Sequence, residues 1–427
     1  MLYAASFDRP IVGDSSDEID GRSCKSAQTH YTFAMPLKML FTAFEPSGDQ
    51  LGAGLFQTLR KHMPDVEGFG FGGPKMAQAG IELIEQTTDH AAMFTDVLSL
   101  IRIFRKRRAR LAEILKTRDV DLHVPVDSPA GNWPFCKLIR RMKPDAKIIH
   151  LAAPQVWAWA SWRVGKLRRL TDHVLCLLPF EPDWFADKDV PATFVGHPMF
   201  DRPPLTDGQA VTCAGKFPTD AVKLALLPGS RNAEVDRNWP MMLEVARRLS
   251  AIEPRLVATI GARDETLASR IANLTAEHSA DQSSAASPQI ETSIGQFEET
   301  LAWADMALVV SGTATLQVAS YRLPMAAVFN TSRFKWQVAG RFIVSIRTFT
   351  LPNLISEWQG DGRAIVELAP HFGAVQPVVD ALSPLLDPDQ REKAGQRLDA
   401  VCAPLRATRF EDAAAAAVLK VIGSEKR

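Results

Sequence analysis

The sequence predicts an α/β protein with two parallel sheets, each covered by helices on both faces. The chain has 427 residues, which exceeds one ordinary hydrophobic core and suits two domains. Short apolar runs alternate with helical patterns along most of its length, as they do in βαβ units. Between residues 197 and 218 the alternation stops, and turn-forming residues gather without periodicity. The expected architecture is therefore two Rossmann-like domains that face a central cleft.

The first alternating series contains six apolar runs that we expect to form strands. They cover residues 39–44, 68–71, 121–126, 147–151, 173–178 and 192–195. A helix is expected over 48–62, directly after the first strand. Because parallel strands end at one edge of a sheet, loops that follow these strands are candidate ligand sites.

The second series repeats the pattern with strands expected over 222–227, 255–260, 306–310 and 325–329. Three helices, over 375–386, 390–405 and 409–421, complete the chain. Residues 351–353 are interpreted as a turn and 365–368 as the edge of a helix. These elements predict five segments: an N-terminal extension with poor order (1–37), a first domain (38–200), a linker (201–221), a second domain (222–385) and C-terminal helices (386–427).

The composition is that of a globular protein and excludes several classes. Hydrophobic residues make up 46% and charged residues 23%, which argues against disorder. The 49 basic residues balance 49 acidic ones, so the basic excess typical of a nucleic-acid-binding protein is absent. The 5 cysteines form no CxxC pair, which predicts no zinc site or disulfide framework and favours a reducing compartment. No apolar run reaches the roughly 18 residues of a membrane span, and the first residues do not form a secretory signal.

Two loops of the first series combine glycine with a helix start. Residues 44–52 (FEPSGDQLG) place Glu45, Ser47, Gly48 and Asp49 at the beginning of a helix, where free N–H groups face a ligand. Ser47 and Asp49 also suit a helix cap or first turn. Gly73 precedes a proline in residues 69–76, which fits a substrate loop and a structural turn equally well.

Three further residues of the first series have both a functional and a structural interpretation. Asp127 ends an apolar strand, where its carboxylate could accept a proton from a substrate hydroxyl or cap the next helix. Trp157 and Trp159 could form a platform for a sugar or acyl chain, or pack against a domain edge. His197 lies at the end of the first series, where it is a ligand candidate or a structural histidine.

In the second series, residues 226–231 (LLPGSR) follow a strand and open a helix. Gly229 permits a turn, Ser230 donates a hydrogen bond, and Arg231 can bind a phosphate bidentately. A positive side chain at a helix N-terminus is unfavourable unless an anion lies there, which favours a diphosphate site.

The segment SGTATLQ, residues 311–317, repeats this arrangement after another strand. Ser311, Gly312, Thr313, Thr315 and Gln317 supply hydroxyl, amide and free N–H groups at a helix start. Such groups suit a diphosphate or a ribose. Capping alone explains one of the hydroxyls more readily than all three.

In this order and spacing, the motifs resemble those of the lipid-A-disaccharide synthases, a family of inverting GT-B glycosyltransferases. The similar segments run from Glu45 to Glu367 and include WAW, LPFEP, FVGHP, LPGSR, SGTAT and LPN. The resemblance implies transfer of 2,3-diacylglucosamine from its UDP derivative to lipid X, which forms a β-1,6 disaccharide and releases UDP. It also implies a hexosyltransferase that needs neither metal nor cofactor, a homodimer with exchanged C-terminal segments, and a location at the inner face of the cytoplasmic membrane.

The resemblance also implies roles for particular residues. Asp127 would be the general base and Arg231 would bind the diphosphate. Substrate-binding positions would be Glu45, Ser47, Gly48, Asp49 and Gly73 on the acceptor side, with Trp157, His197, Ser230, Ser311, Gly312, Thr313, Thr315, Gln317, Asn353 and Glu367.

Several positions depart from the family pattern. Phe44 stands where the family motif GEASGD opens with glycine, and Gly131 stands where the segment GID-x-PDFN has an aromatic residue. Further departures are Pro125 for glycine and Ala130 for the second Asp of that segment, Gln317 for Glu, and Val366 for Pro. Two alternatives therefore stay open. One is another GT-B enzyme, either a UDP-sugar epimerase or a transferase with a different acceptor, and the other is a non-catalytic homologue that binds nucleotide sugar or lipid.

Residues 97–116 form a basic amphipathic pattern, with seven Lys or Arg between apolar residues. Such a helix suits an anionic membrane surface, where an acylated substrate would be collected. A solvated helix face is the alternative. Together with the resemblance, this pattern predicts peripheral membrane contact.

Overall fold

The computed structural model describes residues 36–88, 97–206, 217–279, 288–337 and 346–423. Residues 1–35 of the expected extension and 207–216 of the expected linker lie outside these ranges. The chain divides into two compact units, Met1–Ile148 and Ile149–Arg427. The five expected segment boundaries stay predictions.

The first sheet has seven parallel strands in the order β3-β2-β1-β4-β5-β6-β7. They are β1 (Lys38–Thr42), β2 (Glu67–Gly72), β3 (Glu82–Gln86), β4 (Leu122–Pro125), β5 (Lys147–Leu151), β6 (His173–Cys176) and β7 (Ala192–Phe194). Leu40 and Phe41 of β1 have no exposed surface. A central parallel strand is covered on both faces, which explains why the sequence shows a continuous apolar run there.

The strands of the first sheet are connected mainly by helices. These are α1 (Pro46–His62), α2 (Pro74–Gln78), α3 (Val97–Ile114), α4 (Pro129–Met142), α5 (Val164–Leu170) and α6 (Glu181–Ala186), with short 3₁₀ turns η1 (Ser161–Arg163) and η2 (Pro198–Phe200). Three of the α-helices begin with proline, which suits the first helical position because its missing N–H would have no partner there.

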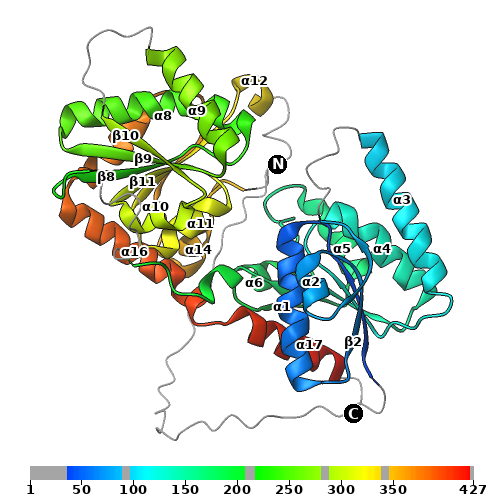
Figure 1. Ribbon diagram of the computed structural model, residues 1–427. Coiled ribbons are helices and arrows are strands. Elements are labelled where there is room, and N and C mark those ends of the chain that lie inside the picture. Colours follow the sequence, from blue (N-terminus) through cyan, green and yellow to red (C-terminus); the bar gives the residue numbers. More distant parts are fainter. Residues whose placement is uncertain (1–35, 89–96, 207–216, 280–287, 338–345, 424–427) are drawn as a thin grey trace, which may run out of the picture. The chain divides into compact units, whose positions relative to one another are not determined.

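The second sheet has six parallel strands in the order β10-β9-β8-β11-β12-β13. They are β8 (Val222–Leu227), β9 (Leu256–Ala262), β10 (Gln289–Ile294), β11 (Met306–Val310), β12 (Met325–Asn330) and β13 (Val366–His371). Figure 1 shows α8 (Asn232–Ile252) and α9 (Glu265–Ser279) over one face of this sheet. It shows α10 (Phe297–Trp303), α11 (Thr313–Ser320) and α14 (Leu351–Gln359) over the other.

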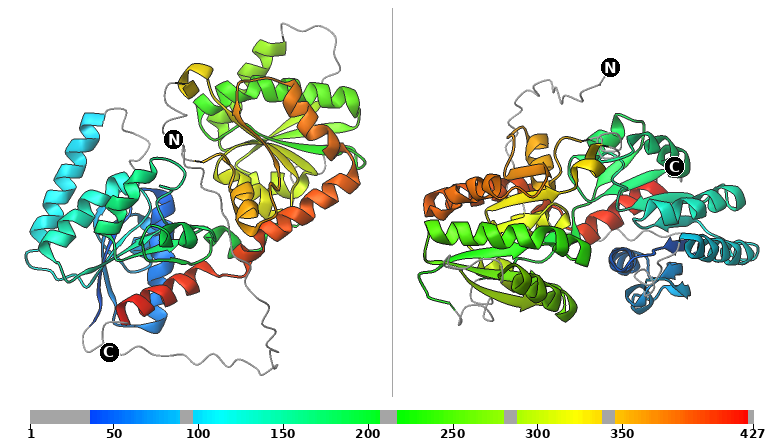
Figure 2. Two further views of the ribbon diagram at one scale, coloured as in Figure 1. Left: turned by 180° about the vertical axis from the view of Figure 1, so that it is seen from behind. Right: turned by 90° about the horizontal axis from the view of Figure 1, so that it is seen from above.

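The chain ends in a series of helices, the last of which packs against a strand of the first sheet. After α12 (Arg333–Lys335) and α14 come α15 (Gln376–Leu382), η5 (Ser383–Leu386), α16 (Pro388–Arg406) and α17 (Phe410–Gly423). Figure 2 shows α17 continuing beyond α16, and α17 packs against β6. Gly196, just after β7, permits close approach to the α16–α17 turn, since a Cβ there would lie 2.3 Å from the Thr408 carbonyl oxygen. Among the described residues, none of the helices has both the length and the apolar character needed to cross a bilayer.

Both sheets reverse their strand order at one point, between β1 and β4 and between β8 and β11. Ligands of open α/β sheets bind at such points, beyond the carboxyl ends of the strands. The motif beginning at Glu45 follows β1 and Asp127 follows β4, while LPGSR follows β8 and SGTAT follows β11. Four of the predicted motifs therefore lie at the two switch points.

The predicted strands and helices are present, with shifts of a few residues at their ends. The interpretation of residues 365–368 as a helix edge is wrong, because Val366 begins strand β13. Residues 351–353 are the first turn of α14, which Pro352 can enter because it needs no N–H partner there. Strands β3 and β10 are additional to those predicted.

Candidate functional site

Asp49 joins the two glycine-containing loops of the first unit. Its carboxylate accepts hydrogen bonds from the backbone N–H groups of Gly73 (2.8 Å), Lys75 (3.0 Å) and Met76 (3.0 Å), at the start of α2. The side chain is buried, and a Cβ on Gly73 would lie 2.6 Å from its Oδ2. Asp49 therefore holds one loop against the other, and glycine is needed at residue 73 for the close approach.

Beside this junction lies a cavity of about 290 Å³. Its lining comprises Pro46, Ser47, Asp49, Gln50, Pro74, Lys75 and Thr88. Glu45 occupies the N-cap position of α1 without a side-chain hydrogen bond to the helix, and both Glu45 and Ser47 are exposed. The structure thus brings the expected acceptor-side residues together. Among them, Asp49 uses its carboxylate to bond the backbone N–H groups of the second loop.

Asp127 follows β4 in a strained backbone conformation. Asp127 and Ser128 have φ angles of 48° and 32°, in the left-handed region that costs an L-residue roughly 1–2 kcal/mol. The N-cap of α4 is Ser128, so the alternative role of Asp127 as the cap does not apply. Burial raises the pKa of the Asp127 carboxyl above its usual value, and the backbone N–H of Ser128 opposes this shift. Strain and a raised pKa are both common at catalytic carboxylates.

A buried polar chain fixes the backbone around Asp127. The Asn132 amide nitrogen donates to the carbonyl oxygens of Val126 (2.8 Å) and Asp127 (2.9 Å). Its Oδ1 accepts from the Thr42 hydroxyl at 2.6 Å, and that hydroxyl lies 2.9 Å from His123 Nε2. Asn132 was not among the site residues predicted from the sequence. The position of Asn132 in the first turn of the helix after Asp127 could have indicated that it bonds the backbone there.

Two departures from the family pattern contact each other. A Cβ on Gly131 would lie 2.8 Å from Cδ2 of Phe44. The Phe44 ring also packs against Phe104 and Phe135, with ring centroids 4.9 and 5.3 Å away. Phe44 thus fills the space that an aromatic residue at 131 would need. The large side chain at 44 and the missing side chain at 131 therefore compensate each other in volume.

In the second unit, an internal carboxylate occupies the LPGSR turn. Glu234 Oε2 accepts from the backbone N–H groups of Ser230 (3.0 Å) and Arg231 (3.3 Å), and its Oε1 lies 3.0 Å from Arg231 Nη1. The LPGSR sequence predicts an external anion at this helix start. Glu234 supplies a negative charge there, and its position three residues after the N-cap is the spacing of a capping box.

The SGTAT loop uses two of its hydroxyls internally. Ser311 donates to the Phe349 carbonyl oxygen at 2.9 Å, and Thr315 to the Gly312 carbonyl oxygen at 2.7 Å. Thr313 is exposed in the first turn of α11, and a Cβ on Gly312 would meet open space. Of the three hydroxyls, that of Thr313 is therefore the one best placed to bind a ligand, together with the N–H groups at the start of α11.

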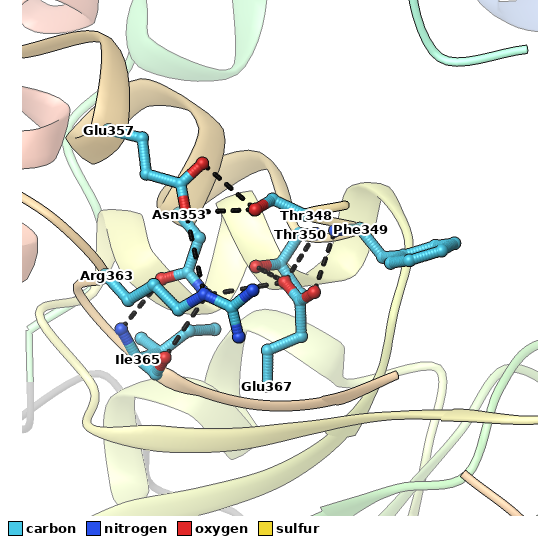
Figure 3. Close-up of polar contacts among 8 residues, drawn as sticks. All are labelled: Thr348, Phe349, Thr350, Asn353, Glu357, Arg363, Ile365 and Glu367. Carbon is cyan, nitrogen blue, oxygen red and sulfur yellow. Dashed lines mark hydrogen bonds and ion pairs between the residues drawn. The ribbon is translucent and has the colours of Figure 1, made fainter. Parts of the chain in front are cut away.

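Figure 3 shows how Glu367 secures the segment that Ser311 contacts. The Glu367 carboxylate accepts from the backbone N–H of Phe349 (2.8 Å) and Thr350 (2.9 Å) and from the Thr350 hydroxyl (2.6 Å). Asn353 donates to it at 3.3 Å and also bonds both backbone polar groups of Ile365. Glu367 and Asn353 are buried, so they hold the start of α14 and, through Phe349, the SGTAT loop.

The WAW and LPFEP motifs meet at a buried hydrogen bond. Trp157 Nε1 donates to Glu181 Oε1 at 2.9 Å, and the Leu178 backbone N–H donates to Oε2 at 3.0 Å. Burial raises the pKa of Glu181 to about 7, although both hydrogen bonds oppose the shift. Trp157 is buried, whereas Trp159 is 48% exposed. Of the two interpretations, packing fits the environment of Trp157.

His197 has a structural contact in this state of the protein. Its Nδ1 accepts from the Met199 backbone N–H at 3.2 Å, which caps the short turn η2. Burial lowers the pKa of His197 to about 4, so the ring is neutral near pH 7. With Nδ1 as the acceptor, the proton lies on Nε2.

Two doubly wound parallel sheets, with loops that carry the predicted motifs at their switch points, are the architecture of GT-B α/β enzymes. Solved structures of this kind are similar in fold. The complex of S. aureus MnaA with UDP gives a TM-score of 0.59 at 12% identity and covers 91% of this chain and 96% of that one. Acinetobacter baumannii MurG gives 0.51 at 11% identity, over 91% of this chain and 100% of that one.

The chain belongs to the lipid-A-disaccharide synthetase family, whose model matches residues 39–368. It is 32% identical over 358 residues to the lipid-A-disaccharide synthase of Idiomarina loihiensis, which covers 83% of this chain and 90% of that protein. It is 32% identical over 392 residues to the synthase of Pseudomonas fluorescens, at 91% and 99% coverage. The expected family, fold class and class of enzyme, a glycosyltransferase, are confirmed.

Proposed function

We propose that this protein transfers 2,3-diacylglucosamine from its UDP derivative to lipid X, forming the β-1,6 lipid A disaccharide and UDP. The observation that carries the proposal is the family match over residues 39–368, with the matching motifs at both switch points. A UDP-sugar epimerase is disfavoured, because the similarity to UDP-N-acetylglucosamine 2-epimerase is 13% identity and concerns the fold alone.

In the proposed reaction, the acceptor hydroxyl attacks the anomeric carbon and the bond from that carbon to the UDP oxygen breaks. Asp127 takes the hydroxyl proton, and UDP leaves with the electron pair of the broken bond. The raised pKa of Asp127 suits a base that must hold a proton during transfer. Arg231 and the N–H groups at the starts of α8 and α11 stabilise the charge that develops on UDP.

The remaining predicted residues divide into contact and positioning roles. We propose substrate contact for Glu45, Ser47, Gly48, Ser230, Gly312, Thr313 and Gln317, and positioning for Asp49, Gly73, Trp157, His197, Ser311, Thr315, Asn353 and Glu367. The division follows the hydrogen bonds described above, since a side chain bonded inside the protein acts on substrate through what it holds. Gln317 can bond ribose hydroxyls, but more weakly than the Glu of the family pattern.

The decisive experiment incubates the purified chain with UDP-2,3-diacylglucosamine and lipid X and detects the disaccharide by mass spectrometry. We expect one disaccharide for each UDP released. Asp127→Asn is the matched variant, because it keeps the size of the side chain and removes the base. UDP binding without any disaccharide would favour the non-catalytic alternative, and disaccharide formed with another acceptor would favour a different transferase.

We propose peripheral contact with the inner face of the cytoplasmic membrane. The cations of α3 support it, since Arg102, Arg105, Lys106, Arg108 and Arg110 are exposed. The apolar side of α3 is partly used inside the protein, because Phe104 packs on Phe44 and Leu111 is buried. Arg107 is also buried and forms an ion pair with Glu85 at 2.7 Å. Electrostatic attraction to anionic lipid is therefore the main expected contribution of α3.

A second exposed surface supports the same contact. Trp159 and Trp162 are 48% and 69% exposed, and Arg163 stacks over the Trp159 ring at 4.7 Å. Tryptophan with basic neighbours is typical of a membrane–water interface. Flotation with liposomes should show binding that rises with anionic lipid and falls in Trp159→Ser/Trp162→Ser. Equal binding to neutral and anionic liposomes would remove the proposal.

The assembly and the domain roles are also proposals. Residues 38–200 would bind the acceptor and the membrane, and residues 222–385 the UDP-sugar. The homodimer implied by the resemblance can be tested by light scattering on the full chain, where a mass near 47.0 kDa would exclude it.

A further inference from the structure

The turn proposed to bind the donor diphosphate already holds a negative charge. Glu234 engages three donors, the backbone N–H groups of Ser230 and Arg231 and the Arg231 guanidinium. These are the groups assigned above to the diphosphate. Carboxylate and phosphate oxygens use the same kind of donor, so the two anions compete for them.

The turn is shaped around this carboxylate. Gly229 has a φ of 115°, and a Cβ there would lie 2.6 Å from both Oε2 and Cβ of Glu234. Asn238 donates to the carbonyl oxygens of Pro228 (3.2 Å) and Glu234 (2.8 Å), which ties the turn to the helix. Glycine at 229 and the amide of Asn238 therefore keep the Glu234 side chain close to the donors.

We propose that the Glu234 carboxylate is an internal substitute for the donor diphosphate and leaves these donors when the nucleotide binds. The proposal rests on the proposed function, since it assigns a role within the same donor site. It makes Glu234 a residue that sets nucleotide affinity, while the transfer chemistry belongs to other groups.

The exposure of the pair allows this exchange. The side chain of Arg231 is 79% exposed and that of Glu234 is 32% exposed. An ion pair so open to water is weak, because water screens the charges. A diphosphate carries more charge than one carboxylate and can displace it. When UDP leaves, Glu234 returns to the N–H groups, which lowers the affinity for UDP and favours its release.

A purely structural capping role makes a different prediction. A cap stabilises α8 and leaves nucleotide affinity unchanged when it is weakened. Glu234→Gln separates the two roles, because its amide oxygen can still accept from the N–H groups but carries no charge. Glu244→Gln is the matched control, since Glu244 lies on the same helix and pairs with Arg248 at 2.9 Å.

The experiment measures UDP binding to the full chain by calorimetry and UDP dissociation by stopped flow. We expect Glu234→Gln to bind UDP roughly two- to fivefold more tightly, the effect of removing an exposed competing charge, and to release it more slowly. Glu244→Gln should match the wild type. Glu234→Ala, which removes both the charge and the accepting oxygen, should bind UDP at least as tightly as Glu234→Gln.

Two failures can be distinguished. If Arg231→Ala weakens UDP binding but the Glu234 variants bind no more tightly than wild type, the substitute role is wrong and the donor site stands. If Arg231→Ala binds UDP as the wild type does, the assignment of the donor site itself is wrong.

Discussion

Two aspartates follow neighbouring strands of the first sheet, and the protein uses them differently. Asp49, after β1, is 2% exposed and accepts three backbone N–H groups. Asp127, after β4, lies in a strained turn, and burial raises its pKa. A carboxylate whose oxygens are filled by N–H donors fixes loops, whereas one with spare capacity and a raised pKa can take a proton. Position at a switch point alone does not distinguish them.

The largest expected effect is on Asp127. Asp127→Asn should lower kcat by about 10²- to 10⁴-fold, because the amide cannot take the hydroxyl proton. Disaccharide formation under saturating substrates measures it. Asp119→Asn is the control, since Asp119 precedes β4 and forms an exposed pair with Lys143. If a folded Asp127→Asn variant turned over substrate at the wild-type rate, Asp127 would not be the base and the proposed difference between the two aspartates would be wrong.

The next largest effect is expected on stability, at the contact between Phe44 and Gly131. Phe44→Gly removes a buried ring and should lower the free energy of unfolding by about 3–5 kcal/mol. Gly131→Phe should also destabilise, because its Cβ alone would come within 2.8 Å of Phe44.

Urea unfolding of the double variant Phe44→Gly/Gly131→Phe completes this test. The double variant should recover much of the lost stability, because the new ring occupies the vacated space. Additive losses in the double variant would mean that the two turns are packed independently.

A smaller effect is expected at Asp49. Asp49→Asn can keep the two hydrogen bonds that Oδ1 accepts, with less charge, but loses the one from the Lys75 N–H because an amide nitrogen cannot accept. It should lower the free energy of unfolding by about 1–3 kcal/mol. Its kcat should fall far less than that of Asp127→Asn, since Asp49 is assigned to holding loops. Asp65→Asn, at an exposed loop position, is the control. A loss of kcat as large as that of Asp127→Asn, in a protein of normal stability, would make both carboxylates catalytic.

The finest test is the pH dependence of kcat/KM. The base must be ionised, and burial raises its pKa, so activity should fall on acidification at a pH above the usual aspartate value of about 3.9. Glu181, with its pKa raised to about 7, could add a second titration, and Glu181→Gln separates them. The acid limb should persist in Glu181→Gln. A limb at or below the usual value would remove the support for Asp127 as the base.

The sequence predicted central strands better than edge strands. The strands not found or misread, β3, β10 and β13, each lie at an edge of a sheet. ELIEQ and QIETSI contain charged or polar residues because an edge strand is covered by neighbours less completely. In VELAPH the charged residue Glu367 is instead buried and bonds groups inside the protein, which apolar patterning does not reveal. Buried central strands such as KMLFT and VKLALL need apolar residues on both faces, which makes them visible in the sequence.

For the site, the sequence predicted positions better than contacts. Asp49 and Glu367 were both predicted to be site residues, but their bonds to backbone N–H groups depend on segments 17 to 27 residues away. Spacing in the sequence does not reveal which donors a carboxylate meets. The contact of Glu234 was not predicted either, although its three-residue distance from Arg231 is a local capping pattern that the sequence contains.

The contact between Phe44 and Gly131 also restricts the order in which these residues could have changed from the family pattern. Two aromatic rings cannot share the space above Gly131, where a Cβ is already 2.8 Å from Phe44. A chain that first lost the aromatic residue at 131 would keep its backbone and carry a void until phenylalanine appeared at 44. An empty cavity lowers the stability but leaves the backbone of both turns in place. Two overlapping rings would force the turns apart. Of the two single changes, the loss of the aromatic residue at 131 is therefore the one that both turns can accommodate without moving apart.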